Sequence, residues 1–308
     1  MRNGHSPDSP TTVAICVPTF RRPQGLRKLL QSLAEISVEG LGNVRPRLVV
    51  VDNDVDGSAG SVVAEWHGRW PLDYVVEPRR GEPYARNLAV DRASDAELIA
   101  FIDDDEWADP EWLAELVKTQ GESCADIVLG PVIPRFAVPP SSWLERGGFF
   151  GPLQFPPNSR LHFAYGGNVL VRASVFQDLR FSERYVKLGG VDTHLFMRAH
   201  LAGRTIVWSP GARVFESIPP ERMRLGWLVR REFRRGNTLS LCLLELEASP
   251  WRLLKRCVHG SLRAGLGAAY ILLAVVRGRV AFARGLREAA FGVGLLAGLL
   301  KYEYQEYP

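Results

Sequence analysis

Residues 97–106 read Glu-Leu-Ile-Ala-Phe-Ile-Asp-Asp-Asp-Glu, and the apolar residues 98–102 lead directly into four acidic ones. The apolar run is typical of a strand buried on both faces, and the acidic run lies where that strand would end. Carboxylates two residues apart can share one hard divalent ion, and packed like charges repel without one. The stretch therefore indicates either a metal site or a solvated acidic turn before a helix.

Apolar runs of the same kind alternate with helical patterns on both sides of this stretch. The expected strands are 13–18, 47–51, 72–76, 97–102, 126–129, 166–171, 205–208 and 212–215, and the expected helices are 23–36, 61–66, 84–93, 191–202 and one starting near Pro110. This alternation predicts an α/β fold, Rossmann-like, with a mainly parallel central sheet and helices on both faces. Ligands bind at the carboxyl ends of strands in such sheets, which directs attention to Pro18, Thr19, Asp52 and the three aspartates.

Composition and cysteine spacing limit the possible classes of protein and the division of the chain into regions. The chain has 308 residues of ordinary globular composition, and its four cysteines are too far apart for a zinc motif or a disulfide framework. Residues 1–12 are polar and are expected to form a flexible N-terminus without a secretory signal. Residues 13–221 are expected to form the α/β domain. Residues 131–157 contain seven prolines and are expected to be irregular.

Residues 222–308 differ from the rest of the chain. They carry 15 basic and six acidic residues, a net +9, whereas residues 1–221 carry a net −5. Two apolar segments, Leu262–Val276 and Ala281–Leu300, are too short or too charged to be convincing membrane spans. We expect a basic, apolar helical region that lies on an anionic membrane surface, with a dimer contact or a soluble helical subdomain as alternatives. Nucleic acid is not expected as a partner, because the region has few polar residues that could read bases.

Five further motifs accompany Asp103-Asp104-Asp105 in a fixed order. They are Val17-Pro18-Thr19-Phe20-Arg21-Arg22, Val50-Val51-Asp52-Asn53, Gly81-Glu82-Pro83-Tyr84-Ala85-Arg86-Asn87, Gly166-Gly167-Asn168 with the following strand, and Gly189-Gly190-Val191-Asp192. Together they resemble the glycosyltransferase family 2 enzymes with the GT-A fold, and most of all the succinoglycan-type bacterial exopolysaccharide glycosyltransferases. The resemblance covers about Thr12 to Glu216.

The resemblance implies a role for each matching residue. The residues expected to bind the nucleotide sugar are Pro18, Thr19, Arg21, Asp52, Arg86, Asp103 and Asp104. Asp105 and Asp103 are expected to hold a divalent metal ion, Mn²⁺ or Mg²⁺, beside the diphosphate. Asp192 is expected to be the catalytic base, and the acceptor-side residues are Gly167, Asn168 and His194.

Some of these side chains also have ordinary structural interpretations. Asp52 could be a turn residue, and Asp192 could cap a helix. Arg86 could pair bidentately with the diphosphate or with a carboxylate, and its structural alternative is an arginine on a helix surface. Two positions depart from the family pattern. Val191 replaces the usual glutamate before the base, and His194 stands where an acidic residue is common. His194 could pair with Asp192 or bind the acceptor, but a position on the helix surface is the default expectation.

The resemblance implies an inverting, metal-dependent transferase that uses a nucleotide sugar, most plausibly a UDP-sugar. The expected acceptor is a glycan on a polyprenyl diphosphate, so the expected location is cytoplasmic and peripheral to the inner membrane. The main alternative is a non-catalytic glycosyltransferase-like partner that binds nucleotide sugar or glycan for another enzyme. A nucleotidyltransferase and a dinucleotide dehydrogenase fit less well, because no glycine-rich phosphate loop follows the first strand. The oligomeric state is left open.

Overall fold

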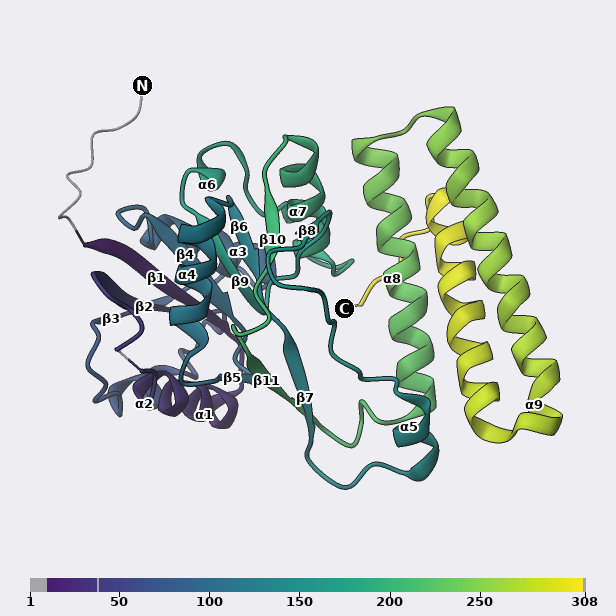
Figure 1. Ribbon diagram of the computed structural model, residues 1–308, viewed down its shortest axis with the longest axis horizontal. Coiled ribbons are helices and arrows are strands. Elements are labelled where there is room, and N and C mark those ends of the chain that lie inside the picture. Colours follow the sequence, from purple (N-terminus) through teal and green to yellow (C-terminus); the bar gives the residue numbers. More distant parts are fainter. Residues whose placement is uncertain (1–9, 38, 307–308) are drawn as a thin grey trace. The chain divides into compact units, whose positions relative to one another are not determined.

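The computed structural model describes residues 10–37 and 39–306 (Figure 1). The strands are β1 (Thr11–Thr19), β2 (Val44–Asp52), β3 (Leu72–Val76), β4 (Leu98–Ile102), β5 (Glu106–Ala108), β6 (Ile127–Leu129), β7 (Val132–Phe136), β8 (Arg160–Leu161), β9 (Asn168–Arg172), β10 (Ile206–Trp208) and β11 (Val214–Ile218). The helices are α1 (Pro23–Ala34), α2 (Gly60–Ala64), α3 (Glu82–Arg92), α4 (Trp112–Ser123), α5 (Ser142–Gly147), α6 (Val175–Asp178), the 3₁₀ helix Glu183–Tyr185, α7 (Val191–Leu201), α8 (Leu225–Leu246) and α9 (Pro250–Leu299). Residues 1–9 of the expected flexible N-terminus lie outside the described residues, whereas Thr11 and Thr12 already belong to β1.

The chain divides into two compact units, which we describe separately. The first contains the described residues up to Ile133 together with Pro152–Glu183 and Leu195–Glu216. The second contains Pro134–Gly151, Arg184–His194 and the described residues from Ser217 onward. The second unit therefore includes the basic region from residue 222 and two segments that precede it in the chain.

A large sheet forms the centre of the first unit, with the strand order β3-β2-β1-β4-β9-β6-β10-β8. The pairs β3–β2, β2–β1, β1–β4 and β6–β10 are parallel. Strand β9 runs antiparallel to both of its neighbours, β4 and β6, and β8 runs antiparallel to β10. The predicted α/β class with a mainly parallel sheet is confirmed, and the antiparallel insertion of β9 is a feature that the sequence pattern did not predict.

Strand β1 shows how helices come to cover both faces of this sheet. Val13, Ile15 and Val17 belong to the same apolar core as the buried residues of α1 and α4. The alternate residue Cys16 faces the opposite side, where its Sγ lies 3.7 Å from the carbonyl oxygen of Ala89 in α3. Successive side chains of a strand point to opposite faces, so a strand buried on both sides needs apolar residues throughout. This explains the uninterrupted apolar runs of the sequence.

The strand register brings the polar strand ends to one edge. Thr19 at the end of β1 is paired with Asp52 at the end of β2, and Ile102 at the end of β4 is paired with Asn168 at the start of β9. The first turn of α1 packs closely against this edge at Gly25. A Cβ at Gly25 would lie 2.4 Å from the carbonyl oxygen of Asp104, the middle residue of the three-aspartate turn. Only glycine therefore allows α1 to lie this close to the turn.

The expectation that residues 131–157 are irregular is wrong in part. They contain β7, which is the edge strand of a small sheet with the order β5-β11-β7, and the helix α5. An edge strand tolerates Pro134, because a residue there can lack the N–H donor that an inner strand needs. In the second unit, Trp143 and Leu144 of α5 are buried in an apolar cluster with Leu228 and Ala283. The prolines of residues 131–140 thus lie at an edge strand and before a helix, and those of residues 152–157 lie in the stretch between α5 and β8.

Helices α8 and α9 form most of the second unit. Helix α9 is broken at Gly278, where φ is 71°, and its two arms lie antiparallel beside α8 (Figure 1). Glycines allow the two arms to approach closely, since a Cβ at Gly267 would lie 2.4 Å from the backbone nitrogen of Ala289. An ion pair of 2.7 Å between Arg263 and Glu288 joins the arms.

Within the described part of the chain, α9 is the helix long and apolar enough to cross a membrane by length and composition alone. Its most apolar window has a mean hydropathy of 1.6, and only 17% of that window is buried. The break at Gly278 divides α9 into two arms, and the ion pair between Arg263 and Glu288 connects them. That neither apolar segment spans a membrane stays a prediction.

Candidate active site

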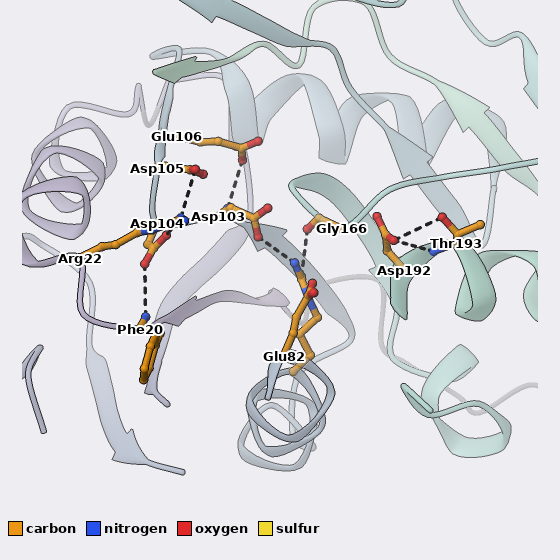
Figure 2. A network of polar contacts seen from close by, with 11 residues as sticks. Phe20, Arg22, Glu82, Asp103, Asp104, Asp105, Glu106, Gly166, Asp192 and Thr193 are labelled. Carbon is orange, nitrogen blue, oxygen red and sulfur yellow. Dashed lines mark hydrogen bonds and ion pairs between the residues drawn. The ribbon is translucent and has the colours of Figure 1, made fainter. Parts of the chain in front are cut away.

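The three aspartates form a turn directly after β4, and Asp104 is the member that points into the protein (Figure 2). Its Oδ2 accepts hydrogen bonds from Thr19 Oγ1 at 2.8 Å and from the backbone N–H of Phe20 at 3.4 Å. Its Oδ1 accepts one from Arg22 at 2.9 Å. Burial raises the pKa of Asp104, and Arg22 and Thr19 oppose that shift. Asp104 therefore ties the aspartate turn to the loop after β1.

Asp103 and Asp105 are more open. Solvent reaches 35% of the Asp103 side chain and 23% of the Asp105 side chain. Asp103 Oδ1 accepts a hydrogen bond of 2.8 Å from Arg86, and Asp105 Oδ2 accepts one of 3.1 Å from the same Arg22 nitrogen that contacts Asp104. The pKa of Asp103 is raised to about 7, because protein atoms surround the carboxyl and neighbouring acids add negative charge that Arg86 offsets only partly. These are the two carboxylates that could reach a ligand.

Arg86 is buried on α3 and uses its guanidinium as a support. It donates to Glu82 Oε1 at 2.7 Å, to the carbonyl oxygen of Gly166 at 3.1 Å and to Asp103 Oδ1 at 2.8 Å. Its guanidinium also lies over the rings of Phe101 and Phe181. Of the two partners expected for Arg86, the structure shows the carboxylate, and a single N–H group of the guanidinium binds Asp103.

Glu106 is a further acidic residue at this site, and the sequence interpretation gave it no role. Its Oε2 accepts the backbone N–H of Asp103 at 3.1 Å, and Glu106 N–H donates to the carbonyl oxygen of Asp103 at 3.1 Å. Burial and the nearby negative charge of Asp103 raise the pKa of Glu106 well above its usual range. A Cβ at Gly167 would lie 2.5 Å from Glu106 Oε1 and 3.1 Å from Asp103 Oδ2. Gly167 thus leaves space beside these carboxyl groups. The available sequence signal for Glu106 was its place as the fourth acidic residue after the apolar run.

The side chain of Asp52 is fully buried and supports the loop after β2. Its oxygens accept hydrogen bonds from the backbone N–H groups of Asp54 and Ala59 and from Tyr74 Oη, at 3.1, 2.7 and 3.0 Å. Arg21, which has a positive φ of 52°, forms a two-pronged pair with Asp54. Both side chains are therefore engaged within the protein, at the edge where the nucleotide was expected. Pro18 is half-buried in β1 on the same edge.

Asn168 is completely buried at the start of β9. Its Nδ2 donates to the carbonyl oxygens of Pro131 and Ala212 at 2.9 and 2.7 Å, and its Oδ1 accepts from Trp112 Nε1 at 2.8 Å. These bonds join β9 to three other segments of the first unit. Asn168 was expected on the acceptor side, and the structure shows it as a support for the strand that carries Gly167.

Asp192 and His194 belong to the second unit. Gly190 accepts the first helical hydrogen bond of α7, from His194 N–H, so Asp192 lies inside the first turn and is not the cap. Its Oδ1 accepts from the backbone N–H of Thr193 at 2.7 Å (Figure 2). The default expectation of a surface His194 is wrong, because the ring is buried. It stacks on Tyr185 and its Nε2 lies 3.1 Å from Glu245 Oε1 of α8.

A divalent ion would have to rely on few protein ligands here. No group of three His, Cys, Asp or Glu side chains that could hold a metal ion is found in residues 10–37 and 39–306. Mg²⁺ and similar ions are commonly held by one or two carboxylates together with the phosphates of a substrate. Asp103 and Asp105 are hard oxygen donors on one turn and are both accessible, so they fit an ion that arrives with a diphosphate.

Comparison with known proteins agrees with this arrangement. The family model described as Glycosyl transferase family 2 matches residues 14–180, and the model described as Glycosyl transferase family group 2 matches residues 98–300. The succinoglycan biosynthesis protein ExoM of Rhizobium meliloti (strain 1021) is 35% identical over 243 residues, which cover 78% of this chain and 77% of ExoM. This chain belongs to glycosyl transferase family 2.

Other members and structural neighbours are more distant. The glucosyl-dolichyl phosphate glucuronosyltransferase of Haloferax volcanii is 24% identical over 258 residues, or 73% of this chain and 74% of that protein. The mannosyltransferase PcManGT from Pyrobaculum calidifontis, solved with GDP-Man and Mn²⁺, has a TM-score of 0.62 at 19% identity and covers 99% of this chain and 91% of its own. The TarS fragment 1–349 of S. aureus, solved with UDP, has a TM-score of 0.55 at 17% identity, with 93% and 91% covered. These neighbours show that the family 2 chain has the GT-A fold.

The structure brings most of the expected nucleotide and metal residues of this family 2 chain together in the first unit. They are Pro18, Thr19, Arg21, Asp52, Arg86, Asp103, Asp104 and Asp105, with Gly167 and Asn168 beside them. Arg22 and Glu106 join them, although the sequence assigned neither a site role. Asp192 and His194 lie in the second unit, so their roles remain proposals.

Proposed function

We propose that the protein is an inverting, metal-dependent glycosyltransferase that transfers a sugar from a UDP-sugar to a glycan on a polyprenyl diphosphate, in bacterial exopolysaccharide biosynthesis. One observation carries the proposal: of the three aspartates at the strand edge, Asp104 is used internally, and Asp103 and Asp105 remain accessible. Two open carboxylates beside a cationic side chain suit the binding of a nucleoside diphosphate with its metal ion.

The roles of the chain's own residues follow from their contacts. Arg86 and Glu106 hold Asp103 in place, and Thr19 and Arg22 hold Asp104. A bound Mn²⁺ or Mg²⁺ would supply positive charge that stabilises the leaving diphosphate. Arg22 has an exposed side chain and can turn from the carboxylates to a phosphate oxygen, because a guanidinium binds both kinds of group. It is therefore our proposal for a second cation at the diphosphate.

Asp192 is our proposal for the catalytic base. Inverting transfer requires a carboxylate that accepts the proton of the acceptor hydroxyl as that oxygen attacks the sugar. Asp192 lies in the first turn of α7, which follows two glycines with positive φ, so a rigid element fixes the position of the carboxylate. The support for this role is its match to the family position, with Val191 in place of the usual glutamate.

Relatives support the class of substrates. ExoM is named for succinoglycan biosynthesis, and the glucuronosyltransferase of Haloferax volcanii is named for a sugar linked to dolichyl phosphate. Solved neighbours hold UDP, UDP-GlcNAc or GDP-Man, so the uridine base is part of the proposal. A lipid-linked acceptor would be reached at a membrane, and the long apolar α9 supports a cytoplasmic enzyme that associates peripherally with the inner membrane.

Calorimetric titration with UDP, with and without Mn²⁺, tests the metal–diphosphate site. We expect binding that depends on Mn²⁺ and is lost in Asp105→Ala, while the control Asp95→Ala, which removes an exposed carboxylate of the first unit, retains it. The metal role of Asp105 would be contradicted if both variants lost UDP binding. It would also be contradicted if the wild type bound UDP equally well with and without Mn²⁺.

The catalytic part needs a separate experiment. Asp192→Asn should bind UDP and Mn²⁺ like the wild type but fail to transfer sugar to a polyprenyl-diphosphate-linked acceptor, and NMR of the wild-type product should show the inverted anomer. Full transfer by Asp192→Asn would refute its role as base. A wild-type protein that binds UDP-sugars but transfers none would favour the non-catalytic partner.

A further inference from the structure

The second unit contains an open hollow at the end of α8 and the start of α9, with a volume of about 380 Å³. It is lined by Leu243, Glu247, Arg252, Lys255, Arg256 and His259. Three of these side chains are permanently cationic and one is anionic, so the lining has a net positive charge even with a neutral histidine. The family motifs include none of these residues.

Internal ion pairs do not balance this charge. Arg252 forms an ion pair with Glu247, which accounts for the one carboxylate of the hollow. Lys255 lies 5.0 Å from the centre of the Trp251 ring, and within the described residues neither Lys255 nor Arg256 forms an ion pair with a carboxylate. Burial lowers the pKa of Arg256, and burial and the nearby arginine charges lower the pKa of His259. A bound anion would relieve the excess of positive charge.

An apolar stripe runs along the helix beside the hollow. Trp251, Leu254, Val258 and Leu262 recur every three or four residues on the first arm of α9 and are 50–67% exposed. The spacing places them on one face of the helix, and Leu272 and Val276 continue that face toward the break at Gly278. Large apolar side chains in a continuous exposed row indicate a surface that another phase or molecule covers.

The basic residues follow the apolar ones along the helix. Arg252, Lys255 and His259 come one residue after Trp251, Leu254 and Val258, and Arg256 comes two residues after Leu254. One residue corresponds to about 100° around a helix, so the basic residues lie on the same side of the apolar stripe. An apolar face with a basic edge is the arrangement of helices that lie in the plane of a membrane surface.

We infer that this hollow binds the phosphate group of a membrane lipid while the apolar stripe of α9 enters the adjoining acyl region. The inference extends the proposed membrane location of the enzyme and does not depend on the aspartate site. Lys255 and Arg256 supply the charge-assisted hydrogen bonds to phosphate oxygens, and Arg256 can do so with two parallel N–H groups. A second copy of the chain would fit this surface of α9 less well, because a dimer formed through it would bring two sets of basic residues together.

Vesicle sedimentation with the full chain tests the inference. The vesicles are phosphatidylcholine alone, phosphatidylcholine with phosphatidylglycerol, and phosphatidylcholine with undecaprenyl phosphate at the same anionic content. The test variant is Lys255→Gln with Arg256→Gln. The control is Arg284→Gln with Lys301→Gln, which removes the same charge from exposed positions of the second unit outside the hollow.

We expect the test variant to lose about thirtyfold in affinity for anionic vesicles, and the control to lose much less. Inorganic phosphate should compete with the wild type more than chloride of equal ionic strength does. Stronger binding to undecaprenyl phosphate vesicles would identify a phosphomonoester lipid as the occupant, and equal binding would identify phospholipid headgroups in general. Either result supports a lipid phosphate site.

Equal losses in test and control variants would overturn the inference, since they would show a general charge effect. Wild-type protein that ignores all anionic vesicles, or that elutes as a dimer which the test variant disrupts, would overturn it as well. Circular dichroism and UDP–Mn²⁺ titration of each variant show whether it is folded. They also separate failure of this site from failure of the proposed catalytic function, because UDP binding should be unchanged by the substitutions in α9.

Discussion

Replacement of Arg86 by methionine tests whether that residue positions Asp103 or binds the nucleotide. Methionine keeps the aliphatic part of the side chain but removes the guanidinium, whose carbon lies 5.4 and 5.8 Å from the ring centres of Phe101 and Phe181. It removes hydrogen bonds of 2.7, 3.1 and 2.8 Å to Glu82, Gly166 and Asp103. The substitution therefore removes the polar contacts together with the two ring contacts of the guanidinium.

The expected loss of stability in Arg86→Met follows from the burial of its ion pairs. Removing one partner of a buried ion pair costs about 3–5 kcal/mol, because the other partner stays uncompensated. Here the side chains of Glu82 and Asp103 are 33% and 35% exposed, so water can solvate them in part. We therefore expect a loss near the lower limit, about 3 kcal/mol in the free energy of unfolding.

The same helix offers a matched control. Arg92 makes two hydrogen bonds to one carboxylate, that of Asp73, at 2.7 and 2.8 Å, but at the surface. Urea unfolding should show a large loss for Arg86→Met and only a small one for Arg92→Met, since exposed ion pairs contribute little. Calorimetry should show that Arg86→Met weakens UDP binding about tenfold in the presence of Mn²⁺, because one charge-assisted bond that orients Asp103 is gone.

Two results would refute the reasoning. If Arg86→Met and Arg92→Met lose the same stability, the fork of Arg86 is not an important internal contact. If Arg86→Met weakens UDP binding equally with and without Mn²⁺, Arg86 acts on the nucleotide directly and not through Asp103.

Three further predictions concern the same turn. Because the folded pKa of Asp103, about 7, lies above its ordinary value of 3.8, the folded protein retains a proton that the unfolded chain releases. The metal-free thermal midpoint should therefore fall as the pH rises through this interval, and UDP–Mn²⁺ should oppose the fall because it binds the charged form. Arg22→Gln frees an oxygen of Asp105 from its cation, so binding of Mn²⁺ without nucleotide should tighten severalfold by electron paramagnetic resonance titration. Gly25→Ala should lower the free energy of unfolding by about 1–3 kcal/mol through its clash with the aspartate turn, whereas Gly121→Ala, with open space around it, should raise it by about 1 kcal/mol.

The sequence predicted the strand–helix alternation of the first unit well, because a buried strand must be apolar on both faces. It did not predict the direction of β9, since direction depends on the route of the connecting chain and not on the composition of the strand. It also does not predict β7 and α5, because a high proline content indicates irregular structure. Pro134 lies in an edge strand and Pro139 and Pro140 lie before a helix, where a missing N–H group does little harm.

Site positions were easier to predict than the use of each side chain. Asp52 lies at the expected strand end and Asn168 in the expected strand, but their polar atoms are engaged by backbone groups and a tryptophan that the sequence could not assign. The burial of His194 is not predicted from the sequence, because its partner Glu245 is 51 residues away. A motif therefore predicts where a polar residue lies, and long-range packing decides whether it faces a ligand or the protein.

The turn after β4 shows how the chain resolves the repulsion within its acidic motif. Hydrogen bonds run both ways between Asp103 and Glu106, from each backbone N–H to an oxygen of the other residue, and fix the turn. That conformation directs Asp104 inward, where Thr19 and Arg22 compensate its charge. The nitrogen of Arg22 that binds Asp104 is also the one that reaches Asp105. The buried aspartate therefore positions a cation against the exposed one. Under the proposed function, a metal ion that binds Asp105 would displace this cation, and a diphosphate would be the group that receives it. We therefore propose that binding of metal and nucleotide is coupled through Arg22.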